Sequence, residues 1–169
     1  MEDLHDLPGH LIRRLQQIAV AIFVAEITAA GHDLTPVQYA ALATTAAHPG
    51  LDQATLAGYI AYDRSTIGGV VDRLVQKGLV IRQTSDRDRR ARQLRATERG
   101  LRLIEEIEPA VKRAQDLMLS GLDSHERPQF MALLKKATDA TNDFSRAPLR
   151  GVGTGTGSSR KRTSNGHEG

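Results

Sequence analysis

The sequence predicts a mainly α-helical fold that carries one small β-hairpin. Apolar residues recur along most of the chain at the three- and four-residue spacing that lines one face of a helix. Two short runs, residues 79–82 and 92–96, break this pattern and are typical of strands on either side of a charged tip. Hydrophobic residues make up 40% of the 169 residues, which is enough for a buried core in one domain.

The first predicted helix is long. Pro8 is a residue favoured at the first position of a helix, and Asp6 lies near the cap. Gly31 ends the pattern about six turns later. The apolar positions in between are Leu11, Leu15, Ile18, Ile22 and Ala25. So long an opening helix fits either core packing or contact with a second copy of the chain, and the pattern leaves both open.

A second helix is predicted from about Val37 to Ala47. Thr35 is a suitable N-cap residue, and Pro36 is suited to the first helical position. The His-Pro-Gly sequence at 48–50 ends this helix.

Two further helices follow closely. Asp52 caps the third, and Asp63 caps the fourth, which Gly78 ends. Residues of the fourth helix that are expected to face inward are Ile67, Val70, Val71 and Leu74. Two helices joined by so short a turn predict a helix-turn-helix, in which the second helix enters the major groove of DNA.

The tip of the hairpin is rich in charge. Its arginines are Arg87, Arg89, Arg90 and Arg92, interleaved with Asp86 and Asp88. A charged tip is commonly only a solvated turn, but four arginines within six residues directly after a helix-turn-helix favour contact with DNA. A narrow minor groove concentrates negative potential and admits an arginine, which the two aspartates would orient through charge-assisted hydrogen bonds.

The C-terminal part predicts two helices and a tail. Thr97 caps a long helix in which Pro109 should cause a kink or a break. A last helix follows the turn at 122–126 and runs to about Phe144. From Arg146 the composition becomes rich in glycine and serine, which predicts a disordered basic tail. The tail either has no role or adds non-specific attraction to phosphates.

These patterns divide the chain into four parts. Residues 1–33 are expected to form an N-terminal helix, and residues 34–98 a winged helix-turn-helix lobe. Residues 99–145 are expected to form C-terminal helices, and residues 146–169 the tail, with the N- and C-terminal helices as candidates for dimerisation.

Residues at the start of the second helix of a helix-turn-helix contact base edges and phosphates. The candidates for DNA contact outside the hairpin are Arg64, Ser65, Thr66, Gly69 and Arg73. Two alternatives remain open. Ser65 and Thr66 would also serve as caps of the first turn, and Arg73 would also pair with an acid such as Glu98.

The chain resembles the MarR family of bacterial winged-helix regulators, most closely between Leu34 and Gly100. Asp88-Arg89-Arg90 followed by Ala96-Thr97 matches the wing signature of that family, with alanine in place of leucine. The segment Val71-Asp72-Arg73-Leu74 and the following Lys77-Gly78-Leu79-Val80 also match.

This resemblance implies an obligate homodimer whose terminal helices interlock, with one winged helix on each half of a palindromic operator in double-stranded DNA. It implies that Arg90 enters the minor groove and that the helix from Asp63 enters the major groove. Gly68-Gly69 stands where many members have threonine and arginine. Fewer side chains are then available for reading bases, and the helix is able to lie closer to the DNA.

The stretches at 7–14 and 62–69 look like a subgroup that controls the breakdown of aromatic acids, including nicotinate-type compounds. This implies a small aromatic carboxylate effector, which needs a cation or several donors in a mostly apolar pocket. The candidate effector residues are His10, Arg14 and Gln17 on the first helix, with Tyr39 and His48 from the second. The alternative is that these side chains are solvated or form pairs across an interface.

Several function classes find no support in the sequence. The chain has no cysteine, which excludes disulfides and thiolate sites, and it shows no catalytic or nucleotide-binding motif. We therefore expect no enzyme and no cofactor. No apolar run approaches the roughly 20 residues of a membrane span, and a cytoplasmic location is the default expectation.

The leading hypothesis is a repressor that the aromatic acid releases from its operator. A constitutive DNA-binding protein without an effector is an alternative. A zinc-responsive regulator is another. It would use the histidines His5, His10, His32 and His48, although none of these has the spacing of a local metal motif.

Overall fold

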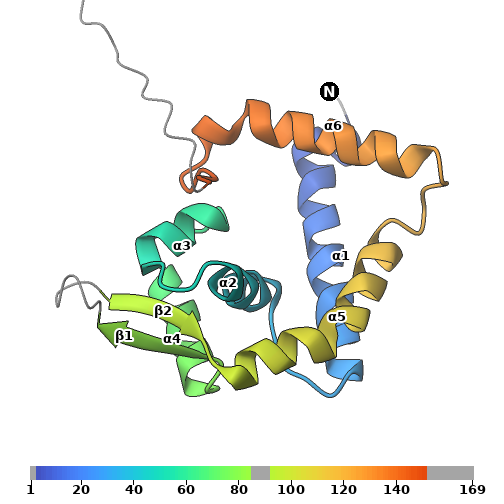
Figure 1. Cartoon of the computed structure of the whole chain (residues 1–169). Helices are drawn as coiled ribbons and strands as arrows, with labels where there is room; N and C mark the ends of the chain where they lie inside the picture. Colours follow the sequence, from blue (N-terminus) through green and yellow to red (C-terminus); the bar gives the residue numbers. More distant parts are fainter. Residues whose placement is uncertain (1–2, 85–91, 152–169) are drawn as a thin grey trace, which may run out of the picture.

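The computed structural model describes residues 3–84 and 92–151. Six α-helices, two short 3₁₀ helices and one hairpin follow one another along these residues (Figure 1). The order is η1 (Leu4–Asp6), α1 (Pro8–Ala29), α2 (Pro36–Ala47), α3 (Gln53–Tyr59), α4 (Ile67–Gln76), β1 (Val80–Thr84), β2 (Arg92–Ala96), α5 (Glu98–Met118), α6 (Glu126–Ala140) and η2 (Asn142–Phe144). The expected mainly α-helical class with a small hairpin is confirmed.

The core lies where α2, α3 and α4 pack against the hairpin and the start of α5. The four residues of α4 that were expected to face inward are all buried. They meet Leu42 of α2, Leu56 of α3 and Leu94 of β2, each of which is fully buried. Burying large aliphatic side chains contributes about 1.5–3 kcal/mol each, so this cluster fixes the relative positions of α3 and α4.

The hairpin is a two-stranded antiparallel ladder in which Val80 is opposite Ala96 and Thr84 is opposite Arg92. The free edge of β2 is held by the loop before α3. Leu94 donates its backbone N–H to the carbonyl oxygen of Leu51 at 2.8 Å and accepts from the N–H of Gly50 at 2.9 Å. The hairpin is therefore tied to the helix-turn-helix through its backbone as well as through its core residues.

Helix α5 connects two parts of the molecule. Its first turn lies on the connection between α4 and β1, and its later residues pack along α1. Arg113 of α5 forms an ion pair with Glu26 of α1, with 2.9 Å between Nε and Oε2. Pro109 does not split the helix, but Figure 1 shows that α5 changes direction near its middle. Proline removes one backbone hydrogen bond and crowds the preceding turn, so the predicted kink has the expected cause.

Helix α6 and the first half of α1 bury little. Helix α6 has no buried residue, and large apolar side chains on it are exposed. The exposed fractions are 66% for Leu133 and 50% for Met131, and Ile12 of α1 is 63% exposed. In α1, the residues that are buried are Phe23 and Ile27, near its end. Within residues 3–84 and 92–151, a large part of these two helices therefore has no packing partner.

The caps agree with the sequence except at the start of the fourth helix. Thr35 and Gln38 form a reciprocal capping box on α2, and Asp52 caps α3. The prediction that Asp63 begins the fourth helix is wrong, because α4 begins at Ile67 and residues 64–66 form a separate turn. Asp6 lies directly before Leu7, the N-cap residue of α1, whose side chain makes no capping hydrogen bond.

The prediction of a disordered tail from residue 146 is also wrong for residues 146–151. This segment comes back from η2 and lies on α3, where the backbone N–H of Arg150 donates to the carbonyl oxygen of Gly58 at 2.8 Å (Figure 1). The composition alone gave no sign of this contact. The segment with the basic residues Arg160, Lys161 and Arg162 lies outside the described residues.

The turn between α3 and α4 contains a strained residue. Ala61 has φ of 51°, in the left-handed region, where an L-residue costs roughly 1–2 kcal/mol. We expect Ala61→Gly to raise the free energy of unfolding by up to about 1 kcal/mol, because glycine adopts this conformation freely. Ala54→Gly, at an exposed position of α3, should lower the same quantity by about 1 kcal/mol. Urea unfolding of both variants tests this, and equal signs would contradict it.

Candidate nucleic-acid interface

Helix α4 has one buried side and one exposed side. The exposed residues, including the N-cap, are Thr66, Gly69, Asp72, Arg73 and Gln76. They follow a three- and four-residue spacing, so they form one stripe along the helix. The core holds the opposite side, and this stripe is therefore the part of the helix-turn-helix that another molecule is able to contact.

The turn before α4 is held by Asp63. Its carboxylate oxygen Oδ1 accepts hydrogen bonds from the backbone N–H and from the hydroxyl of Ser65, both at 2.7 Å. Hydrogen bonding by the Ser65 side chain, followed by that of its backbone and by Arg146, lowers the pKa of the Asp63 carboxyl. Because the Ser65 hydroxyl donates to Asp63, it has lone pairs but no proton to offer to DNA. Ser65 is therefore suited to accept from a base amino group rather than to bind a phosphate.

The two arginines of the helix-turn-helix are exposed. No ion pair involves Arg64 or Arg73 within residues 3–84 and 92–151. Arg73 does not pair with Glu98, which was the alternative, because the Glu98 carboxylate lies 3.6 Å from Arg102. Arg73, Thr66 and Gly69 line a hollow of about 310 Å³ beside α2. Three of the five candidates thus share one surface.

The two glycines of α4 have no internal packing reason. A Cβ atom at Gly69 would meet no heavy atom within 4 Å, and one at Gly68 would meet only the Gln53 side chain, at 3.8 Å. Glycine in a helix costs about 1 kcal/mol relative to alanine. The protein interior would accept alanine at both positions. Either the glycines allow close contact with another molecule, or the structure gives no reason for them.

A polar bridge that the sequence analysis did not predict joins the hairpin to α3 and α4. Arg82 of β1 donates to Asp72 Oδ1 of α4 at 2.5 Å and to Gln53 Oε1 of α3 at 3.0 Å. One guanidinium therefore joins the hairpin to both helices of the helix-turn-helix. Local sequence spacing does not predict such a contact, because the three residues lie on three different elements.

The predicted wing residues lie outside the described residues. These are Asp86, Arg87, Asp88, Arg89 and Arg90. The strands that flank them are described, and they pair up to Thr84 and Arg92. That pair is at the end of the hairpin remote from α5 (Figure 1).

One protomer does not gather the candidate effector residues. Gln17 accepts from Arg13 at 2.9 Å, and the His10 ring lies against His5, 5.2 Å between centroids. Tyr39 packs on Phe23, about 20 Å further along α1 from His10.

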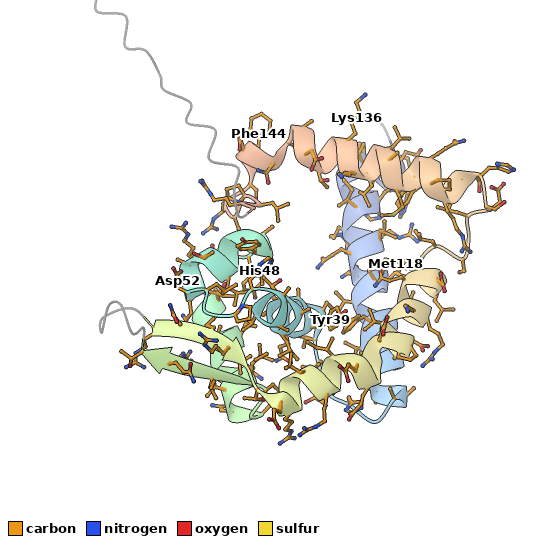
Figure 2. All side chains as sticks on the ribbon, viewed as in Figure 1. Tyr39, His48, Asp52, Met118, Lys136 and Phe144 are labelled. Carbon is orange, nitrogen blue, oxygen red and sulfur yellow. The ribbon has the colours of Figure 1, made fainter. Side chains whose placement is uncertain are left out.

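Figure 2 shows Tyr39 and His48 at opposite ends of α2. The His48 ring lies 4.9 Å from that of Tyr59 in α3. The residues His10, Arg14 and Gln17 thus remain together on α1, while Tyr39 and His48 point to separate neighbours.

Within the described parts of the chain, no group of three or more histidine, aspartate or glutamate side chains is placed to hold a metal ion. Of the histidines proposed for zinc, His5 and His10 lie against each other, but they belong to no such group in these parts. No helix in these parts is long and apolar enough to cross a membrane.

Comparisons with known proteins agree with this geometry. The model of the MarR family matches residues 32–91, which include the helix-turn-helix. The helix-turn-helix transcriptional repressor NicR of Pseudomonas putida is 32% identical over 138 residues, which cover 82% of this chain and 86% of NicR.

Two solved structures are similar in fold over nearly their whole length. PcaV, a transcriptional regulator of Streptomyces coelicolor crystallised with its natural ligand, has a TM-score of 0.74 and 35% identity. The match covers 83% of this chain and 98% of PcaV. BpsR of Bordetella bronchiseptica, whose DNA binding is regulated by 6-hydroxynicotinic acid, has a TM-score of 0.76 and 29% identity. That match covers 82% of this chain and 98% of BpsR. The fold, the exposed stripe of α4 and these relatives agree, and the chain belongs to the MarR family of transcriptional regulators.

Proposed function

We propose that the protein is a homodimeric repressor that binds a palindromic operator and is released from it by a small aromatic acid. The observation that carries the DNA-binding part is the exposed stripe of α4, which contains Arg73, follows the exposed Arg64 of the preceding turn, and has glycine where packing does not require it. A helix without side chains at Gly68 and Gly69 is able to approach the groove closely, while Arg64 and Arg73 reach bases or phosphates.

The apolar residues of α1 and α6 support the dimer. Ile12, Met131 and Leu133 are each at least half exposed in one chain. Exposed apolar surface of this kind marks an interface, and a second copy of the same helices would cover it. A two-fold dimer then presents two α4 helices to half-sites about 34 Å apart.

The effector part follows from the relatives. DNA binding by BpsR is regulated by 6-hydroxynicotinic acid, and PcaV was crystallised with its natural ligand. For this chain we propose a small aromatic carboxylate of the nicotinate or hydroxynicotinate type. His10, Arg14 and Gln17 share one side of α1 and would supply the cation and donors. The acid releases the operator only if it binds the non-DNA-binding arrangement more tightly.

Selection of genomic fragments by the purified protein tests this proposal. The selection is run alone and with each of a panel of aromatic acids. We expect enrichment of a palindromic fragment, and its depletion by one acid. Binding without sequence preference would contradict the repressor. Specific binding that no acid changes would leave a constitutive DNA-binding protein.

Two variants separate the DNA and effector roles. Arg90→Ala should weaken operator binding and make the dependence of log K on log salt shallower by about 0.9, because one phosphate contact is lost. Arg14→Ala should bind the operator normally but lose the response to the acid. Anisotropy titrations at several salt concentrations measure both. Unchanged affinity of the first variant would contradict the wing contact, and a normal response of the second would contradict the effector site.

A further inference from the structure

Residues 145–151, here called the C-terminal strap, lie against the first helix of the helix-turn-helix. The backbone N–H of Arg150 donates to Gly58 of α3 at 2.8 Å. A Cβ atom at Gly58 would lie 3.2 Å from the Cβ atom of Arg150, so the strap packs closely on this glycine. The contact also gives Gly58 a role that the helix alone does not explain.

A side-chain clamp fixes the strap at both of its ends. Asn142 of η2 accepts from the backbone N–H of Leu149 at 2.7 Å and donates to the Leu149 carbonyl oxygen at 3.3 Å. The Ser145 hydroxyl accepts from the N–H of Ala147 at 3.1 Å. Each such bond contributes about 1 kcal/mol, so the loop between η2 and Arg150 is closed by several weak contacts rather than by a core.

The strap brings two arginines beside a third. Arg146 and Arg150 line a hollow of about 420 Å³ together with Arg64 and Asp63 from the turn before α4. Arg64 and Arg150 also line an adjoining hollow of about 320 Å³, which extends to Asp52 and the start of α3. Three arginines thus line the hollows at the place where α3 leads into α4.

Three arginines and two aspartates, Asp52 and Asp63, line the two hollows, so positive charge is in excess among these residues. Asp63 already accepts two hydrogen bonds from Ser65, and its Oδ2 atom lies 3.8 Å from Arg146. The Arg146 side chain is 93% exposed, so this ion pair is weak. Planar guanidinium groups bind phosphate through paired hydrogen bonds, and an exposed group of three would attract a phosphodiester.

We propose that the C-terminal strap is part of the DNA interface and that Arg146 and Arg150 bind backbone phosphates beside the half-site that α4 reads. The first helix of a helix-turn-helix crosses the DNA backbone, and the strap lies on that helix. This inference rests on the proposed function as a DNA-binding protein. It adds contacts from a segment that lies outside the winged helix-turn-helix itself.

Operator binding by full-length variants tests the proposal. The double variant Arg146→Gln/Arg150→Gln should bind the operator about tenfold more weakly, with the slope of log K against log salt reduced by roughly two. Asn142→Ala keeps every charge but loses the clamp, and we expect at least a threefold loss of affinity. Arg102→Gln is the matched control, since this arginine is 63% exposed on α5 and pairs with Glu98 of its own helix. It should bind within twofold of the wild type.

Each outcome bears on the proposal. Wild-type affinity and slope in the double variant would overturn it, as would an equal loss in the Arg102 control. Tighter binding by Asn142→Ala would mean that the strap covers the interface, which also overturns it. If the wild type binds no double-stranded DNA, the proposed function fails together with the strap. If the wild type binds and the strap variants are unchanged, only the strap fails. Arg146→Gln alone changes a fully exposed side chain, so a folding defect does not obscure the result.

Discussion

Replacing Gly100 by alanine is expected to lower the free energy of unfolding by about 3 kcal/mol, which is a large part of the stability of a domain. A Cβ atom at Gly100 would collide with the carbonyl oxygen of Leu79, and it would lie 3.2 Å from Cδ1 of Leu42.

The backbone around Gly100 is unable to move aside easily. Leu79 accepts from the N–H of Thr97 at 3.0 Å, and the Thr97 hydroxyl donates to the carbonyl oxygen of Gly78 at 2.7 Å. The same hydroxyl accepts from the N–H of Gly100 at 3.0 Å. Relieving the collision therefore breaks the bonds that hold the first turn of α5 on the DNA-binding lobe.

Gly9→Ala is the control for this substitution. Gly9 lies in the first turn of α1, and no heavy atom would come within 4 Å of its Cβ. Alanine there should leave stability unchanged or raise it by up to about 1 kcal/mol. Urea unfolding followed by circular dichroism compares the two variants. Similar stability of Gly100→Ala and the wild type would contradict the close approach of α5 to Leu79.

Leu133→Asp is expected to produce monomers and to weaken operator binding by more than about 100-fold. Leu133 is 66% exposed in one chain, so an aspartate there does not disturb the core of the protomer. In the proposed dimer it would place an unpaired charge in an apolar interface. A monomer reaches one half-site, and it loses the gain that comes from binding two linked sites.

Light scattering and anisotropy titrations measure the two effects together. Lys135→Glu is a suitable control, because it places an acid on the other side of the same helix. It should leave the dimer intact. Dimers of Leu133→Asp with normal operator affinity would contradict the proposed role of α6.

The elements that the sequence predicted well are those with local causes. Helix α2 is bounded by a capping box and a His-Pro-Gly stop, and both strands follow from their residue types. The start of α4 was predicted wrongly because Asp63 bonds to Ser65 two residues later, which forms a turn rather than a helical cap. Both conformations use the same aspartate, and the pattern does not distinguish them.

The contacts that the sequence did not predict join distant segments. Arg82 bridges α3 and α4, and the C-terminal strap reaches α3 from the far end of the chain. Both depend on the path of the backbone and not on local spacing. The candidate effector residues show the same limit, since spacing groups His10 with Arg14 but says nothing about which way each end of α2 faces.

The bend of α5 has a mechanical consequence. Its two halves are fixed to different bodies, the first to the lobe through Thr97 and the second to α1 through Arg113. About 16 Å of helix lies between Pro109 and the start of α5. Over that lever arm, a rotation of about 10° displaces the lobe by roughly 3 Å, close to the rise of about 3.4 Å between successive base pairs. A rotation of only about 10° at the bend would therefore move α4 along DNA by nearly one base-pair step.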